Sequence, residues 1–221
     1  KKDQFEMLKA IEHAGDHLLD VVNDVLDLSK IEAGAMSLEI CDFNLSDLID
    51  DLAVMFRIRC EQKGLNWILE KVMPTCSNVQ GDQIKLRQIL INLLGNAVKF
   101  TDSGSVTLRV IQKNDDRYNF EVIDTGTGIG IDEQNEIYKA FHQTKTTATH
   151  TTGTGLGLSI SKKQIELMGG QLTLESELFK GSCFSFRLEF VSSFTKVGAK
   201  DQQYKKIKCL KSGTRLSALV V

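Results

Sequence analysis

The sequence predicts an α/β (α+β) fold: a two-layer sandwich in which helices cover one face of a mixed sheet, preceded by a long bundle helix. Three observations predict it. Segments of helical periodicity alternate with short strand-like runs between residues 36 and 190. Apolar residues recur at three- and four-residue spacing along the first 31 residues. Two glycine-rich loops, at residues 124–130 and 153–158, lie where strands meet helices.

The composition narrows the class of protein. Hydrophobic residues make up 42% and charged residues 25% of 221 residues, as in soluble globular proteins. A net charge of −2 gives no bulk attraction to nucleic acid or anionic lipid. No apolar run reaches the roughly twenty residues that cross a bilayer. The five cysteines form no C-x-x-C pair, which argues against a zinc site or disulfide framework and for a reducing compartment. We expect a cytoplasmic protein, or the cytosolic part of a membrane-anchored receptor.

The first element is a helix over residues 4–31, which Gly34 ends. Its apolar stripe consists of Leu8, Ile11, Gly15, Leu18, Val22 and Val25. Because one helix cannot bury such a stripe, it needs a partner helix or a second subunit, and we expect a homodimer through it. The alternative is that the stripe packs on the core of this chain.

Alternating apolar residues predict a short strand at residues 36–40. A helix follows over residues 45–63, with Asn44 as its cap and Gly64 as its end. Another strand is expected over residues 67–72. The helix and its two flanking signals are the clearest local pattern in the first third of the chain.

The next helix begins after Asp82 and runs to about residue 99. One stripe of it is polar, and its members are Lys85, Gln88, Asn92, Asn96 and Lys99. An exposed helix face is the ordinary explanation of such a stripe. Asparagine is a mediocre helix former, however, so two asparagines one turn apart favour hydrogen bonding or metal coordination.

Residues 105–112 and 117–123 predict a hairpin that leads into the loop DTGTGIG. A short helix is expected within residues 131–141, and the polar stretch 144–152 predicts a flexible lid. A helix over 156–168 and strands at 171–177 and 183–190 complete the domain. Residues 192–213 predict a linker and residues 216–221 the start of a strand. Both ends suggest a piece of a longer protein.

Five motifs occur in a fixed order: NLLGNAVKFT at 92–101, DTGTGIG, IYKAFHQ at 137–143, GTGLGL, and GSCFSFRL at 181–188. Together they resemble the catalytic ATP-binding domain of sensor histidine kinases, in the GHKL superfamily. The segment LLDVVNDVLDLSKIEAG resembles the second helix of that family's dimerisation and phosphotransfer unit. The last residues resemble the start of a receiver domain, as in hybrid kinases. The resemblance implies three regions: an incomplete phosphotransfer helix at 1–34, the catalytic domain at 35–193, and a linker with a possible receiver start at 194–221.

The resemblance also implies roles for residues. The ligands would be ATP and Mg²⁺, with Asn96 as the metal ligand and with Asn92 and Lys99 as catalytic residues. Asp124 would accept a hydrogen bond from the exocyclic amine of adenine. The backbone at Gly126, Gly128 and Ile129 would lie close to the base and sugar. The phosphates would lie on the second loop, at Gly153, Thr154, Gly155, Leu156, Gly157 and Leu158. Free amides and the positive dipole end at a helix start favour such anions.

Other nucleotide-binding classes fit less well. A Walker loop needs G-K-[ST], which does not occur here, and a dinucleotide fingerprint needs a glycine at Leu158. ATPases of the same superfamily carry Glu at the position of Asn92 as a general base, and an amide cannot accept a proton at neutral pH. A degenerate nucleotide-sensing or scaffold module stays open, because Lys145, His150 and Thr152 depart from the family pattern of the lid and second loop.

The expected reaction is transfer of the ATP γ-phosphate to a histidine, and then to an aspartate of a receiver domain. The family's acceptor histidine is followed by an acidic residue. None of the four histidines here is, and His13 and His17 fall on the pattern of the second helix. We therefore expect this chain to bind Mg-ATP without phosphorylating itself.

Overall fold

The computed structural model describes residues 15, 18–19, 21–31, 33–74, 77–114, 116–142 and 154–193. Several expectations lie outside these ranges: Gly153, the polar stretch 144–152, two N-terminal histidines, the linker and the receiver start.

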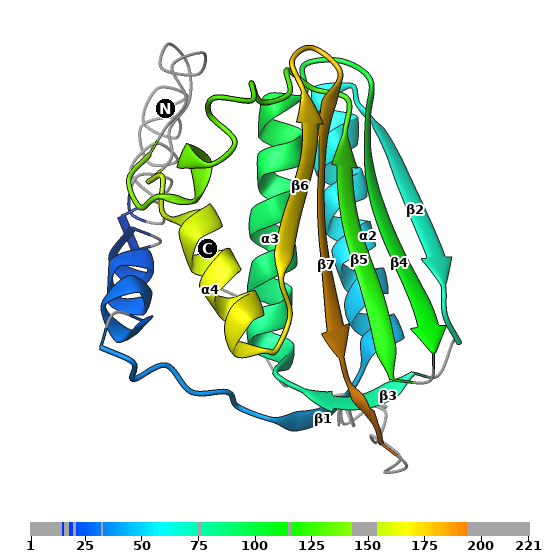
Figure 1. Cartoon of the computed structure of the whole chain (residues 1–221). Helices are drawn as coiled ribbons and strands as arrows, with labels where there is room; N and C mark the ends of the chain where they lie inside the picture. The colour runs from blue at the N-terminus through cyan, green and yellow to red at the C-terminus, as the bar shows by residue number, and fades with distance from the viewer. Residues whose placement is uncertain are drawn as a thin grey trace, which may run out of the picture.

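A five-stranded mixed sheet forms one layer. Its order is β2-β4-β5-β7-β6, and only β2 and β4 run parallel. The strands are β2 (Asn66–Val72), β4 (Ser105–Asn114), β5 (Arg117–Asp124), β6 (Leu172–Glu177) and β7 (Gly181–Glu189). Helices α2 (Leu45–Lys63), α3 (Gln83–Phe100) and α4 (Gly157–Leu167) lie on one face, as Figure 1 shows. The predicted two-layer sandwich is confirmed.

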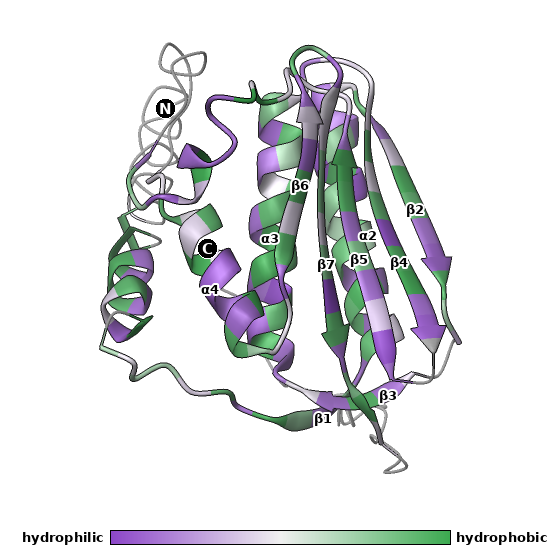
Figure 2. Ribbon diagram, viewed as in Figure 1, coloured by the Kyte–Doolittle hydropathy of each residue, from purple (hydrophilic) through white to green (hydrophobic). Residues whose placement is uncertain are grey.

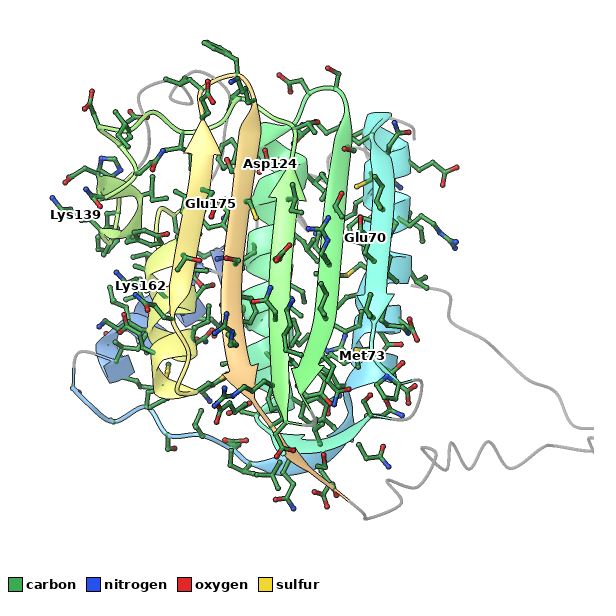
Figure 3. All side chains as sticks on the ribbon, turned by 45° about the vertical axis from the view of Figure 1, so that its right-hand side comes forward. Glu70, Met73, Asp124, Lys139, Lys162 and Glu175 are labelled. Carbon is green, nitrogen blue, oxygen red and sulfur yellow. The ribbon has the colours of Figure 1, made fainter. Side chains whose placement is uncertain are left out.

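The core lies between the sheet and the helices. Hydrophobic and hydrophilic residues alternate along the strands, so one face of the sheet is apolar (Figure 2). Phe120 of β5 stacks on its cross-strand neighbour Phe186 of β7, with ring centroids 4.8 Å apart. The opposite face is polar and turned to the viewer in Figure 3, where Glu70 and Glu175 stand out from it. Burial of this one face fixes the register of the sheet.

The predicted helix caps are present. Asn44 accepts a hydrogen bond from the backbone N–H of Asp47, and Asp82 accepts one from that of Lys85. Gly64 ends α2 in the left-handed region, with φ of 74°. α4 is close to its predicted bounds, and the short helix within residues 131–141 is a 3₁₀ turn, η1 (Glu136–Tyr138).

A second sheet has three strands. It lies at one end of the five-stranded sheet, opposite the end where β5 reaches its C-terminal residue (Figure 1). It consists of β1 (Cys41–Asn44), β3 (Asn78–Gly81) and β8 (Val191–Ser192). The strand predicted at residues 36–40 is wrong, because the pairing with β3 begins only at Cys41. The alternation of apolar residues at 36–40 carries no information on where the partner strand β3 lies. β3 is four residues long and was not predicted.

The N-terminal helix is described over residues 21–31, with helical residues also at 15, 18 and 19. It ends at Gly34, whose φ is 64°, and the N–H of Ala35 donates to the carbonyl of Lys30. It lies beside α4, away from the sheet (Figure 1). In the described ranges, no helix is both long and apolar enough to cross a membrane.

Candidate functional site

The polar stripe of α3 is turned toward α4 rather than toward solvent. Asn92 is half-buried, and its Nδ2 donates to Ser161 Oγ of α4 at 2.8 Å. Its Oδ1 lies so close to Gly157 that a Cβ at that position would clash with it. Asn92 therefore holds the first turn of α4 against α3, and glycine at 157 is what permits this contact.

The two earlier members of the stripe also have protein partners. Lys85 forms an ion pair of 2.9 Å with Asp82, the N-cap of its own helix. Gln88 accepts from Gln164 of α4 at 2.8 Å and donates to Asp27 of the N-terminal helix at 3.2 Å. The stripe thus joins three helices. At these two positions it is neither an exposed face nor a ligand site, but a contact between helices.

Asn96 is the member of the stripe that differs. It is half-buried, and its amide makes no hydrogen bond to any residue in the described part of the chain. One turn earlier, Asn92 contacts the start of α4; one turn later, the Phe100 carbonyl accepts from the N–H of Thr127 in the first glycine loop, at 3.2 Å. Asn96 therefore lies on α3 between its contacts with the two loops.

Asp124 is the last residue of β5 and lies near one end of the sheet, where Figure 3 labels it. Its side chain is 7% exposed, and Oδ1 accepts from the N–H of Gly126 at 2.9 Å. Burial raises the pKa of this carboxyl, while hydrogen bonds from the backbone N–H groups of Gly126 and Ser182 lower it. A further N–H donor, such as an exocyclic amine, would favour the ionised form that burial disfavours.

The glycines of the first loop are required by the protein itself. A Cβ on Gly126 would clash with the Phe100 carbonyl, and one on Gly128 with the carbonyl of Glu177. Gly128 also has φ of 64°, which favours glycine. The expected close approach to base and sugar is thus not needed to explain these glycines. Ile129 is fixed by its N–H, which donates to Ser176 Oγ at 2.8 Å.

The second loop leads into the N-terminus of α4. Thr154 Oγ accepts from the N–H of Leu156 at 3.1 Å. Gly155 has φ of 72°, and its carbonyl accepts from the N–H of Phe141, at 3.1 Å. Leu156 is the N-cap of α4 and supplies no side-chain capping bond, while Leu158 packs against the core. Among the described residues, no side chain caps the first amides of α4, which is the arrangement that anion-binding helix starts require.

Lys99 is less clearly directed at this site than the resemblance implies. Its Nζ lies 4.9 Å from the ring centroid of Phe100, a cation–π contact. Burial lowers the pKa of its ammonium group. The side chain belongs to the correct end of α3, but in this structure it lies against its neighbour's ring.

The arrangement fits a nucleotide with a hard cation. An amide oxygen is a suitable magnesium ligand, and Mg²⁺ keeps several waters and needs few protein ligands. Asn96 lies on α3, and α3 contacts both the loop after Asp124 and the start of α4. Across the described residues, no cluster of three or more His, Cys, Asp or Glu side chains could hold a metal instead.

Three supporting residues were not predicted. Ser161 is buried and accepts from Asn92, Gln164 is buried and donates to Gln88, and Ser176 accepts from Ile129. One signal was available for Ser161: it follows Gly157 by four residues and so shares its helix face. Ser176 belongs to β6, far along the chain from the loop that it supports, and no local pattern indicates that contact.

Comparisons with known proteins show the family to which the chain belongs. The family described as "Histidine kinase-, DNA gyrase B-, and HSP90-like ATPase" matches residues 81–192. The chain is 42% identical over 185 residues to the circadian input-output histidine kinase CikA of Synechococcus elongatus, covering 82% of this chain and 24% of that protein. It is 38% identical over 192 residues to hybrid signal transduction histidine kinase B of Dictyostelium discoideum, covering 84% and 10%.

A solved structure is similar over the same region. Full-length ShkA in complex with AMPPNP has a TM-score of 0.74 and 34% identity, with 86% of this chain and 40% of that chain covered. The chain spans no more than a quarter of the length of the curated relatives named above. The family match over more than half of the chain, together with the shared fold, places α3 and both glycine loops within the ATP-binding domain found in hybrid sensor histidine kinases. The chain belongs to the family of histidine kinase-, DNA gyrase B- and HSP90-like ATPases.

Proposed function

We propose that this chain is the catalytic part of a two-component histidine kinase, which binds Mg-ATP and presents its γ-phosphate to a histidine other than the four in this chain. The observation that carries the proposal is the position of Asn96. It lies on α3 between the contact with the Asp124 loop and the contact with the start of α4. AMPPNP, an analogue of ATP, is bound by the similar ShkA.

The chain's own residues would divide the work. Asp124 would accept a hydrogen bond from the adenine amine, and Asn96 would offer its side-chain oxygen to Mg²⁺. The amides at the start of α4 would hold phosphate oxygens, and Lys99 would add positive charge after leaving the Phe100 ring. Bound Mg²⁺ supplies neutralisation of the developing phosphate charge.

Asn92 favours transfer over hydrolysis. Its Nδ2 is held by Ser161 and its Oδ1 faces Gly157, so its amide positions α4. An amide is also no proton acceptor at neutral pH, so water would lack a general base at this position. We further propose that the phosphate passes to an aspartate of a receiver domain, on this polypeptide or on a separate regulator. A non-catalytic nucleotide-binding module is the second candidate, favoured only by the departures in the lid sequence.

The test is titration of the chain with a fluorescent ATP analogue in excess Mg²⁺. Asn96→Asp places a carboxylate beside the phosphates, and its charge repels them, so we expect affinity to fall by about 10–100-fold, the usual cost of changing a group around a bound metal. Gln171→Glu, an exposed residue just before β6, also converts an amide to a carboxylate, at the other end of the sheet from Asp124, and should leave affinity unchanged. Equal affinities of wild type and Asn96→Asp would remove Asn96 from the site.

A further inference from the structure

The N-terminal helix contacts the nucleotide domain through two acidic side chains on one face. Thr154 Oγ of the second glycine loop donates to Asp24 Oδ2 at 3.0 Å. Gln88 Nε2 of α3 donates to Asp27 Oδ2 at 3.2 Å. Asp24 and Asp27 are three residues apart and therefore lie on the same face of the helix.

The first contact reaches the helix start proposed to hold phosphate. The same Thr154 hydroxyl accepts from the N–H of Leu156, the N-cap of α4. One hydroxyl thus separates the Asp24 carboxylate from the α4 terminus. Because a helix N-terminus carries partial positive charge, it attracts this carboxylate as it would attract a phosphate.

The second contact also leads to α4. Gln88 accepts from Nε2 of Gln164, a residue of α4 that is 1% exposed. Asp27 is therefore connected through α3 to the middle of α4. Both acidic residues act on the same helix, one at its start and one along its length.

The docking leaves the apolar stripe unused. Leu18, Leu19, Val22, Val25 and Leu26 are between 41% and 64% exposed. The helix is therefore held on the nucleotide domain by the face that carries Asp24 and Asp27, on which Val21, Leu28 and Ile31 are also half-buried. The two hydrogen bonds lie at a partly solvated surface, where such contacts contribute little net free energy, so they can open and close readily.

We propose that Asp24 and Asp27 form an acidic latch that holds the N-terminal helix on the second glycine loop and lowers affinity for a nucleoside triphosphate. A triphosphate would compete with Asp24 for the Thr154 hydroxyl and for the positive end of α4, and its charge would repel the carboxylate. Coupling is reciprocal, so nucleotide binding releases the helix. The latch rests on the proposed nucleotide-binding function.

The first experiment measures affinity for AMPPNP with excess Mg²⁺ by calorimetry on the whole chain. Asp24→Ala should bind roughly fivefold more tightly than wild type, the lower end of usual coupling. Two controls are matched: Asn23→Ala changes an exposed neighbour on the same helix, and Glu61→Gln removes one exposed negative charge on α2. Both should bind as wild type does. Equal or weaker binding by Asp24→Ala would overturn the latch.

The second experiment uses the wild-type chain, so it does not depend on how a variant folds. Hydrogen exchange of the amides in residues 21–31 should speed up when AMPPNP is saturating, because the helix is released. Unchanged or slower exchange would contradict the latch. If the wild type bound no AMPPNP at all, the proposed function itself would fail, whereas equal affinities in wild type and Asp24→Ala would reject only the latch.

Discussion

At the scale of the residue, side chains that look alike in the sequence have different tasks. Asn92 and Asn96 are one turn apart on α3, yet Asn92 is committed to Ser161 while Asn96 makes no hydrogen bond within the described ranges. Asp82 and Asp124 both begin local turns. The pKa of Asp82 is lowered by the hydrogen bonds and charge that outweigh its burial, whereas burial raises the pKa of Asp124. A carboxyl whose pKa is raised by burial is the better candidate for a ligand contact, because perturbed pKa values cluster at functional sites.

Replacement of Asp124 should separate stability from function. Since its pKa is raised in the folded state, the stability that this carboxyl contributes is present below its unfolded pKa near 3.8 and is lost as pH rises through the folded pKa. At neutral pH the ionised group is therefore a cost. Asp124→Asn should melt at or above the wild-type temperature and lose binding of a fluorescent ATP analogue. A lower melting temperature at pH 7 with binding retained would contradict both assignments.

At the scale of the element, α3 is the part that organises the site. Its apolar face packs on the sheet, Gln88 and Asn92 link it to α4, and its last residue contacts the first loop. The placement of α4, and with it the second loop, depends on polar contacts with α3 as well as on the burial of Leu156, Ile160 and Ile165. These contacts fix one orientation of α4, which a purely hydrophobic interface specifies less strictly.

The contact between α3 and α4 can be tested by a double-mutant cycle. Gly157→Ala should force the Asn92 side chain away and lose its bond to Ser161, lowering the free energy of unfolding by about 1–2 kcal/mol. In the background of Asn92→Ala, where the obstructing amide is absent, the same substitution should cost less. The measurement is urea unfolding of the four proteins. Additive costs would mean that the two residues do not interact.

Two glycines distinguish a required conformation from a tolerated one. A Cβ on Gly128 would meet backbone at positive φ, so Gly128→Ala should lower the free energy of unfolding by about 2 kcal/mol or more. Gly95 lies within α3, and a Cβ added there would have no atom within 4 Å. Gly95→Ala should therefore raise the free energy of unfolding by about 0.5–1 kcal/mol. Both values come from denaturant titrations. A free energy of unfolding of Gly128→Ala equal to or above that of the wild type would show that the loop tolerates a side chain.

At the scale of the whole molecule, the described residues leave one face of the sheet and one face of the N-terminal helix exposed. The open face of the sheet is polar and internally paired: Arg109 donates to both Glu70 and Glu121 across three strands. The N-terminal helix instead exposes a stripe of apolar side chains. Exposed apolar residues at this spacing are typical of an interface, so we propose that a second copy of this chain covers them.

Substitution within this stripe should change the oligomeric state. Leu19→Glu, at a residue 62% exposed, should shift sedimentation toward the monomer at micromolar concentration, because burying a charge in a helix seam is unfavourable. Ile40→Glu alters a residue of similar exposure outside the helix and should have no such effect. A monomeric wild type, or identical profiles for all three proteins, would show that the stripe forms no dimer.

The sequence by itself determined the elements whose signals are local. The caps Asn44 and Asp82, the glycine that ends α2, the hairpin and the order of helices and strands all depend on neighbours a few residues away, and the fold class followed from them. Only the tertiary structure decided which polar residues serve a ligand and which serve packing. Asn92 meets Ser161 across 69 residues of chain, Ile129 meets Ser176 across 47, and Thr154 meets Asp24 across 130. A side chain's partner at such separations is set by how helices and sheet pack, and no periodicity in the sequence records it.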